Sequence, residues 1–227
     1  MIDLYSAVEP IYDRMWASIE NTGEFDMNNL SSFSAQVGLN YPEENNTGIL
    51  FYGRATNSWD DWYHDPIEMI MQNQTYRPIY NLMHYFSWEF YKDKWFSHIA
   101  WSNICKVAPW KGGNPNNKLW DAQYPYLVEI IKQEVKLLSP SIVVLVTGNT
   151  ASGRWDQPFF EALPGLIDKK ISEEVWLESN EKKCTASLFI GEKLNVLLTD
   201  RPEARPIEPH AHALIHLLQR AGYFRKD

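Results

Sequence analysis

The sequence predicts an α/β domain of three layers, in which helices cover both faces of a central, mostly parallel sheet of about four strands. Short apolar runs of strand length alternate along the chain with segments of helical periodicity, as in domains of this class. The run at residues 142–146 is apolar throughout and mostly β-branched, which is typical of a parallel strand buried on both faces. Hydrophobic residues make up 44% of the 227 residues, which is enough to build the core of one domain.

The N-terminal part of the chain predicts a helical extension of this domain over about residues 1–47. Apolar positions within residues 4–19 recur at roughly helical spacing, which predicts a helix there. Pro10 limits the hydrogen bonding of its first turns. The polar stretch at residues 21–47 predicts a loop with short helical pieces.

Residues 48–52 form an apolar run that ends at Gly53, and they predict a buried strand. A long polar and aromatic loop follows, as far as about Asn73, before a helix-like segment that begins with Pro78. No repeat or linker divides the chain, so we predict a single domain over residues 1–227. The remaining predicted elements are a strand at 98–104, a loop at 106–118, an amphipathic helix at 126–138, a strand at 142–146, a helical segment near Gln157, strands at 186–190 and 194–198, and a last helix at 210–221.

Composition excludes several classes of protein. Lys and Arg number 21 against 29 Asp and Glu, and the net charge of −8 argues against a general nucleic-acid-binding surface, because non-specific affinity comes from neutralised phosphates. Two cysteines are too few for a disulfide scaffold, a four-cysteine zinc site or a cysteine-ligated iron–sulfur cluster. With no apolar run of membrane length and no signal-peptide pattern at the start, we expect a cytoplasmic monomer without a membrane anchor.

Four loops are selected as candidate sites by the topology of parallel sheets, in which ligands bind beyond the carboxyl ends of the strands. The loops begin at Gly53, after Asn103, at Gly148 and at Asp200. The polar, glycine-containing and basic segments of the chain fall largely in these places. This coincidence predicts a ligand site at that edge of the sheet.

The first loop carries groups suited to catalysis and to stacking. Gly53 allows the backbone to pass close to a ligand, and Arg54 follows it as a further base-contacting candidate. Trp59 is a candidate for stacking on a base. The alternative is a capped turn whose aromatic side chains pack into the core. Three polar side chains are catalytic candidates that would position a water molecule: Asn57, Asp60 and Asp61.

Asn103 stands at the end of the second predicted strand. A carboxamide offers a donor and an acceptor side by side, which matches the edge of a pyrimidine and distinguishes a carbonyl from an amino substituent. The alternative is that Asn103 satisfies backbone groups of its loop.

The third and fourth loops supply candidates for contacts with phosphate or DNA. Gly148 and Asn149 lead into a predicted helix whose free backbone amides would hold a phosphate or a carboxylate. Arg201 and Arg205 lie in a loop stiffened by two prolines, and they would clamp a phosphate or insert beside a nucleotide. The alternative is a common strand–glycine–helix junction and a rigid surface connection with solvated charges.

The C-terminal histidines raise the question of a metal. His212 and His216 are four residues apart and would share a helix face, but no carboxylate stands at a spacing that would make it a third metal ligand. We therefore expect surface or packing histidines, with no metal and no cofactor. A serine-nucleophile mechanism is also unsupported, because the chain has no Gly-x-Ser-x-Gly elbow.

From residue 48 to residue 218, an ordered series of motifs resembles the uracil-DNA glycosylase superfamily. The opening strand and its Gly-x-Ala turn lie at residues 49–55, in ILFYGRA. The Thr-Asn-x-x-Lys segment corresponds to SNICK at residues 102–106, followed by Pro109 and by Asn114-Pro115. LSPSIVVLVTGNTA at residues 138–151 is similar to the leucine–proline approach to the third strand and the glycine after it. TDRPE at residues 199–203 falls where the family carries His-Pro-Ser.

The resemblance implies the uracil-DNA glycosylase fold and a pocket for a nucleobase flipped out of the DNA stack. There Asn103 would read the pyrimidine edge, and an aromatic side chain of the first loop would stack on the base. The family cleaves the N-glycosidic bond through a transition state with oxocarbenium character. A carboxylate or a positioned water stabilises the sugar cation, and the pocket stabilises the departing base anion.

The sequence departs from the family pattern at two places. Arg54 and Ala55 stand where an acidic residue or asparagine is expected after Gly53, and neither supplies a carboxylate. Arg201 replaces the expected histidine, and an arginine donates to a base carbonyl or a phosphate but is no general acid at neutral pH. We expect the polar residues 57, 60 and 61 to take over the positioning of water.

The leading functional hypothesis is a divergent DNA glycosylase that removes uracil or another altered base, with DNA or a nucleotide-like ligand as partner. The first alternative is a non-catalytic module that binds a nucleobase, nucleotide or nucleic acid on the same fold, which the replaced carboxylate and histidine motivate. The second alternative is a small-molecule nucleoside or glycoside hydrolase, which the net charge of −8 fits better than DNA binding.

Overall fold

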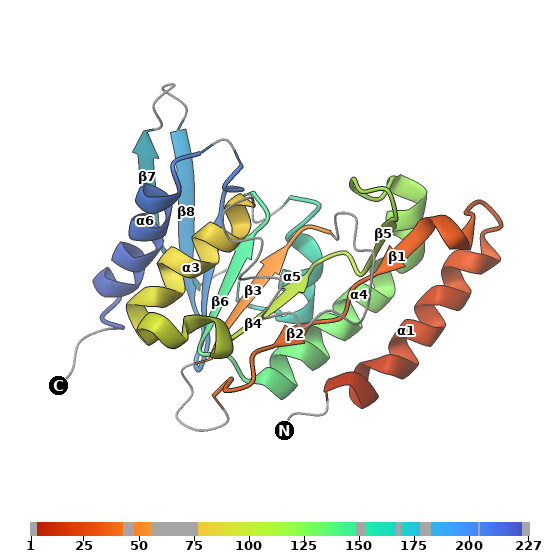
Figure 1. Ribbon diagram of the computed structural model, residues 1–227, viewed down its shortest axis with the longest axis horizontal. Coiled ribbons are helices and arrows are strands. Elements are labelled where there is room, and N and C mark those ends of the chain that lie inside the picture. Colours follow the sequence, from red (N-terminus) through yellow and green to blue (C-terminus); the bar gives the residue numbers. More distant parts are fainter. Residues whose placement is uncertain are drawn as a thin grey trace.

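The computed structural model describes residues 4–42, 48–55, 77–148, 153–166, 169–177, 183–203 and 205–223. The protein is an α/β structure built on a mixed sheet of seven strands (Figure 1). In order across the sheet these are β2 (Gln36–Val37), β4 (Ile99–Asn103), β3 (Ile49–Gly53), β6 (Ile142–Val146), β9 (Asn195–Thr199), β8 (Lys183–Ile190) and β7 (Lys170–Leu177). A second, two-stranded sheet pairs β1 (Leu30–Ser32) with β5 (Val107–Pro109).

The centre of the large sheet consists of four parallel strands, β4, β3, β6 and β9. Their register aligns the carboxyl ends, since Gly53 pairs with Asn103 and Val146 pairs with Thr199. The expectation of about four mostly parallel strands therefore describes only this centre. Antiparallel strands extend both edges, with β2 beside β4 and the β8–β7 ribbon beside β9, so the whole sheet is larger and mixed.

Five α-helices occur among the described residues. The amphipathic helix predicted from residue 126 begins nine residues earlier, because the Asn116 side chain caps it by accepting a hydrogen bond of 2.9 Å from the backbone N–H of Leu119. Pro125 is accommodated inside this helix. The five helices are α1 (Leu4–Asn21), α3 (Pro78–Tyr91), α4 (Asn117–Leu138), α5 (Gln157–Ala162) and α6 (Ile207–Arg220).

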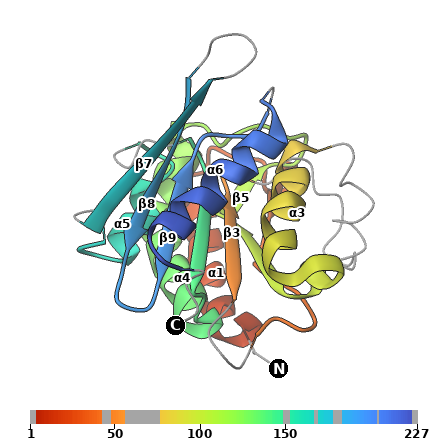
Figure 2. The same cartoon turned by 90° about the vertical axis from the view of Figure 1, so that its left-hand side faces the viewer.

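Helices lie on both faces of the sheet, because alternate side chains along the strands point to opposite faces and pack against the helices there. In β3, Leu50 and Tyr52 belong to a hydrophobic cluster with α1, α4 and α5. Ile49 and Phe51 point the other way, into a second cluster with α3 and α6. Figures 1 and 2 show α3 and α6 on one side of the strands and α1 and α4 on the other.

The N-terminal helix α1 is part of the first hydrophobic cluster. Val8, Met15 and Ile19 are buried on its inner face, and the helix lies alongside α4 (Figure 1). Arg14 forms an exposed ion pair of 2.7 Å with Glu129 of α4. Of the helices within the described ranges, none has both the length and the apolar character that crossing a bilayer requires.

Candidate functional site

A pocket lies at the carboxyl edge of the four parallel strands. It has a volume of about 370 Å³, and it is lined where three of these strands end, by Gly53 of β3, Asn103 of β4 and Val146 of β6. The loop after β9 closes another side with Arg201 and Pro202. Loops far apart in the sequence therefore meet at one cavity, because the parallel strands end at the same edge of the sheet.

Gly53 and Asn103 lie side by side at the carboxyl ends of β3 and β4. They are partners in the β3–β4 register, and a Cβ atom on residue 53 would lie only 2.5 Å from Oδ1 of Asn103. The two strands stay joined beyond this pair, since Gly53 O accepts from Ile104 N at 2.9 Å and Arg54 O from Cys105 N at 2.8 Å. Residue 53 must therefore be glycine for the carboxamide to lie where it does.

The carboxamide of Asn103 is buried and incompletely satisfied. The residue is 2% exposed, and its Nδ2 atom has no hydrogen-bond partner among the described residues. Buried amide groups are nearly always hydrogen-bonded, because losing contact with water without compensation costs about 1–3 kcal/mol. An unpartnered donor beside a cavity indicates a place for a ligand that carries an acceptor.

Aromatic and aliphatic side chains form the walls beside this carboxamide. The rings of Tyr80 and Trp101 meet edge to face, with centroids 5.3 Å apart and an interplanar angle of 86°. Burial raises the pKa of the Tyr80 phenol, so this wall stays uncharged. Ile79 and Val146 also line the pocket. A flat, uncharged ring fits such walls better than a strongly hydrated group does.

The side chain of Arg54 is held at the rim by the end of β6. Its Nε donates a hydrogen bond of 2.6 Å to the carbonyl oxygen of Thr147, and its guanidinium lies 5.3 Å from the ring centroid of Trp155. Gly148, with φ of +117°, leaves the necessary room, since a Cβ atom there would lie 2.7 Å from an Arg54 nitrogen. Burial and the nearby charge of Arg201 lower the pKa of Arg54.

The two arginines predicted in the fourth loop have different surroundings. Arg201 lines the pocket and pairs with Glu203, which lines it too. Arg205 is turned toward its own loop, where Nε donates to Sγ of Cys184 at 3.0 Å and Nη1 donates to the Arg201 carbonyl at 2.6 Å. The geometry of Arg205 is that of a residue that fixes the loop.

The structure thus brings Gly53, Arg54, Asn103 and Arg201 together at one cavity. Gly148 adjoins this cavity through its contact with Arg54. The remaining candidates of the first and third loops lie outside the described residues: Asn57, Trp59, Asp60, Asp61 and Asn149.

Sequence reasoning missed Arg77, Tyr80 and Trp101, which line the same pocket. Arg77 precedes α3, and in a β–α–β unit the amino end of the helix lies at the carboxyl edge of the preceding strand. Applied to the helix predicted from Pro78, that rule could have found Arg77 and Tyr80. In β4, the side chain of Trp101 points to the same face of the sheet as that of Asn103, because the two residues are two positions apart in the strand.

A buried charged cluster supports the β4 end of the pocket from the opposite face of the sheet. Lys106 is fully buried, and its Nζ donates to Ser102 at 2.6 Å and to the two carboxylate oxygens of Glu134 at 2.8 and 2.9 Å. Tyr52 donates a further hydrogen bond of 2.7 Å to Glu134. Burial lowers the pKa of Lys106, and the Glu134 carboxylate opposes that shift. Lys106 comes three residues after Asn103 in sequence, but its contacts are those of a core ion pair.

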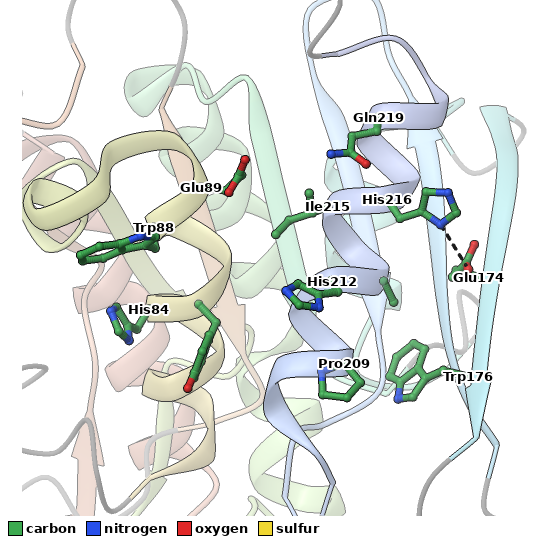
Figure 3. A pocket seen from close by; sticks show the side chains of 12 residues that line it. His84, Trp88, Glu89, Glu174, Trp176, Pro209, His212, Ile215, His216 and Gln219 are labelled. Atoms are coloured by element: carbon green, nitrogen blue, oxygen red, sulfur yellow. Dashed lines mark ion pairs between the residues drawn. The ribbon is translucent and has the colours of Figure 1, made fainter.

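A second, larger hollow of about 840 Å³ lies between α3, α6 and β7 (Figure 3). His84 and Trp88 come from α3, His212 from α6 and Trp176 from β7. At its edge His216 contacts Glu174, with Nδ1 and Oε1 3.4 Å apart. Within the part of the chain that the structure describes, no three His, Cys, Asp or Glu side chains gather as metal ligands.

Comparison with known proteins adds no further assignment. No family model matches the chain, and no curated protein matches it significantly in sequence. The function is therefore inferred from the residues of the pocket around Asn103.

Proposed function

We propose that the pocket around Asn103 binds a pyrimidine base and that the protein is a divergent glycosylase that removes uracil or another altered base from DNA. The observation that carries the proposal is the buried Asn103 carboxamide, whose Nδ2 has no partner among the described residues. A carbonyl oxygen of the base would accept from this atom. The walls formed by Tyr80 and Trp101 support a planar occupant.

The proposal includes a uracil-DNA glycosylase-like arrangement of the fold. Four parallel strands at the centre of the sheet, with helices on both of its faces, support that assignment. We also place the protein in the cytoplasm. The thiols of Cys105 and Cys184 are buried and form no disulfide with each other, which supports a reducing compartment.

In the proposed reaction, a water oxygen bonds to C1′ of the sugar as the bond from C1′ to the base nitrogen breaks. The base leaves with the bonding electron pair, and the proton lost by the water neutralises the base or passes to solvent. The polar residues Asn57, Asp60 and Asp61 come four to eight positions after Gly53, the last residue of β3, and we assign them to positioning that water. The guanidiniums of Arg54 and Arg201 favour the developing base anion because they place positive charge at the pocket.

A second candidate function, binding of a base or nucleotide without cleavage, is favoured by the charges of the pocket. Among the described lining residues the only carboxylate is Glu203, and it is paired with Arg201. Positive charge near the sugar would disfavour an oxocarbenium ion. The same arginines would strengthen the binding of an anionic ligand that stays intact.

Base release from uracil-containing single- and double-stranded DNA and from free deoxyuridine tests the proposal. The Asn103→Ala variant removes the carboxamide. The matched control is Asn195→Ala, which makes the same change at the amino end of β9, the opposite edge of the sheet. We expect release by the wild type and the control and a loss of about tenfold or more in the Asn103 variant, because an acceptor on the base would lose its donor.

Each outcome selects one function. Release from DNA that depends on Asn103 supports the glycosylase. Binding that depends on Asn103, without release, supports the second candidate, and release from deoxyuridine alone indicates a nucleoside hydrolase. Release that is equal in the wild type and the Asn103 variant contradicts the proposal.

A further inference from the structure

Positive charge is concentrated at the pocket of this acidic protein. Arg54, Arg77 and Arg201 all line it, against the single described carboxylate of Glu203. The chain as a whole has a net charge of −8. The three arginines come from separate segments, so only the fold brings them together.

The amino end of α3 adds to the positive potential. Arg77 is the residue before this helix of 14 residues, and Pro78, Ile79 and Tyr80 of its first turn line the pocket. The amino end of a helix carries a partial positive charge and favours anions. The unpartnered Nδ2 of Asn103 lies at the same cavity and independently indicates that a ligand belongs there.

Arg54 is fixed in place before any ligand arrives. The Thr147 carbonyl holds its Nε, the Trp155 ring lies near its guanidinium, and Gly148 leaves room for it. A positioned guanidinium loses little side-chain entropy when it binds an anion. Burial and, after it, repulsion from Arg201 lower the pKa of Arg54, while Asp156, Glu203 and Asp200 oppose that shift. An anion between the two arginines would relieve their remaining repulsion.

Many basic side chains outside the pocket are already engaged within the chain. Lys106 is buried against Glu134, and Arg205 holds the loop backbone at Arg201. A protein that binds duplex DNA along its backbone needs a row of phosphate contacts. Four further basic side chains form ion pairs on the surface: Arg14 with Glu129, Lys118 with Glu24, Lys170 with Glu173 and Arg220 with Glu174.

We infer that Arg54, Arg77 and Arg201 form a subsite for a single phosphate group, beside the base pocket, and that the ligand is one nucleotide unit. This inference rests on the proposed base pocket and adds the chemistry of its neighbour. A free nucleoside monophosphate and a single nucleotide of a DNA strand both present that chemistry. The inferred subsite does not involve extended contact with the backbone of a duplex.

Calorimetric titrations with deoxyuridine, deoxyuridine monophosphate, inorganic phosphate and a uracil-containing single strand test the subsite. We expect the monophosphate to bind about tenfold more tightly than deoxyuridine, because charge-assisted hydrogen bonds to phosphate are roughly twice as strong as neutral ones. For the strand, raising salt from about 50 to 200 mM should weaken binding about threefold, the effect of one phosphate contact. Contacts with six to ten phosphates would weaken it about a thousandfold or more.

Arg77→Gln is the informative variant, because it removes one charge from the subsite and leaves Asn103 in place. We expect it to abolish most of the advantage of the monophosphate over deoxyuridine, and Arg77→Lys to retain part of that advantage. Arg220→Gln, at the far end of α6, is the matched control and should bind as the wild type does. Melting temperatures of all variants check that they fold.

Equal affinity for deoxyuridine and its monophosphate would overturn the inference, as would an Arg77→Gln variant that keeps the full advantage. Asn103-dependent base release could persist in either case, so the proposed function would survive that failure. Conversely, phosphate-dependent binding without any base release would retain the subsite and contradict the glycosylase. Stronger binding of the single strand than of the monophosphate identifies the nucleic acid as the source, and the reverse identifies the free nucleotide.

Discussion

Gly53 and Asn103 constrain each other across β3 and β4. The carboxamide occupies the space that a side chain at position 53 would need, with 2.5 Å between Oδ1 of Asn103 and a Cβ atom placed on residue 53. The same carboxamide leaves its Nδ2 without a partner among the described residues. Gly53 thus leaves room for the Asn103 carboxamide, which is the recognition group of the proposed site.

Gly53→Ala should displace the Asn103 carboxamide and impair ligand binding. We expect the free energy of unfolding to fall by about 1–3 kcal/mol, because the added methyl group overpacks a buried position. Affinity for deoxyuridine monophosphate should fall about tenfold or more. Chemical denaturation and calorimetric titration measure the two effects.

The double variant Gly53→Ala with Asn103→Ala is the control for this explanation. With the carboxamide gone, the alanine at position 53 has room, so the combined loss of stability should be smaller than the sum of the two single losses. Strictly additive losses would show that the two residues do not compete for the same space.

The buried pair of Lys106 and Glu134 makes a second prediction at the scale of residues. Lys106→Met should lower the free energy of unfolding by about 3–5 kcal/mol, because it leaves the Glu134 carboxylate buried without its cation. Adding Glu134→Gln should recover much of this loss, since the amide removes the charge and still accepts from Tyr52. Urea denaturation measures both. A loss as small as that of Arg14→Met, which breaks an exposed pair, would contradict the structural role.

At the scale of elements, the junction of β9 and α6 carries a titratable group. His210 is fully buried on α6, its Nε2 lies 2.6 Å from Oγ1 of Thr199, and burial together with the charge of Arg205 lowers its pKa to about 3. In the unfolded chain the ring titrates near 6.5. Below that pH the unfolded state binds a proton that the folded state does not, so acid favours unfolding.

The expected result is a loss of stability as the pH falls from 6.5 toward 3, of about 1.4 kcal/mol per pH unit from this residue. Above pH 6.5 its contribution should be constant. His210→Gln removes the titration, so the variant should have a shallower acid limb in denaturation curves collected between pH 6.5 and 5. Parallel limbs for the two proteins would show that His210 is already charged when folded.

Secondary-structure elements could be predicted from the sequence where a local residue pattern specifies them. The runs of β3 and β6 are short, apolar and bounded, and their strands begin and end within one residue of the prediction. The strand β7 has no regular alternation of polar and apolar residues and lies at the edge of the sheet, and it is stabilised by pairing with β8, which no local pattern reveals. The two-residue strand β2 likewise exists through its pairing with β4.

At the scale of the whole molecule, part of the site could be predicted from a general rule, and part depends on contacts that the rule does not give. The rule that parallel strands end at one edge was sufficient to bring Gly53, Asn103 and Arg201 to one cavity. It could not tell that Arg205 would turn back to its own loop, because that depends on the Arg201 carbonyl and the Cys184 sulfur. It also could not tell that Lys106 would be buried against Glu134, a residue 28 positions away.

The distribution of charge is a property of the whole molecule too. An acidic protein with a basic pocket attracts an anion only at short range, because at physiological salt charges separated by more than about 8 Å are largely screened. Small or single-stranded ligands therefore suit it better than a long duplex does. This expectation agrees with the single-phosphate subsite inferred from Arg54, Arg77 and Arg201.

The side-chain amide resonances of Asn103 test the central claim most directly. In ¹⁵N-labelled protein they are identified by their disappearance in Asn103→Ala, and they are then followed during titration with deoxyuridine monophosphate. We predict a downfield shift of a side-chain amide proton that saturates with the ligand, because Nδ2 gains an acceptor. Saturating ligand that leaves these resonances unmoved would contradict the assignment of Asn103 as the group that reads the base.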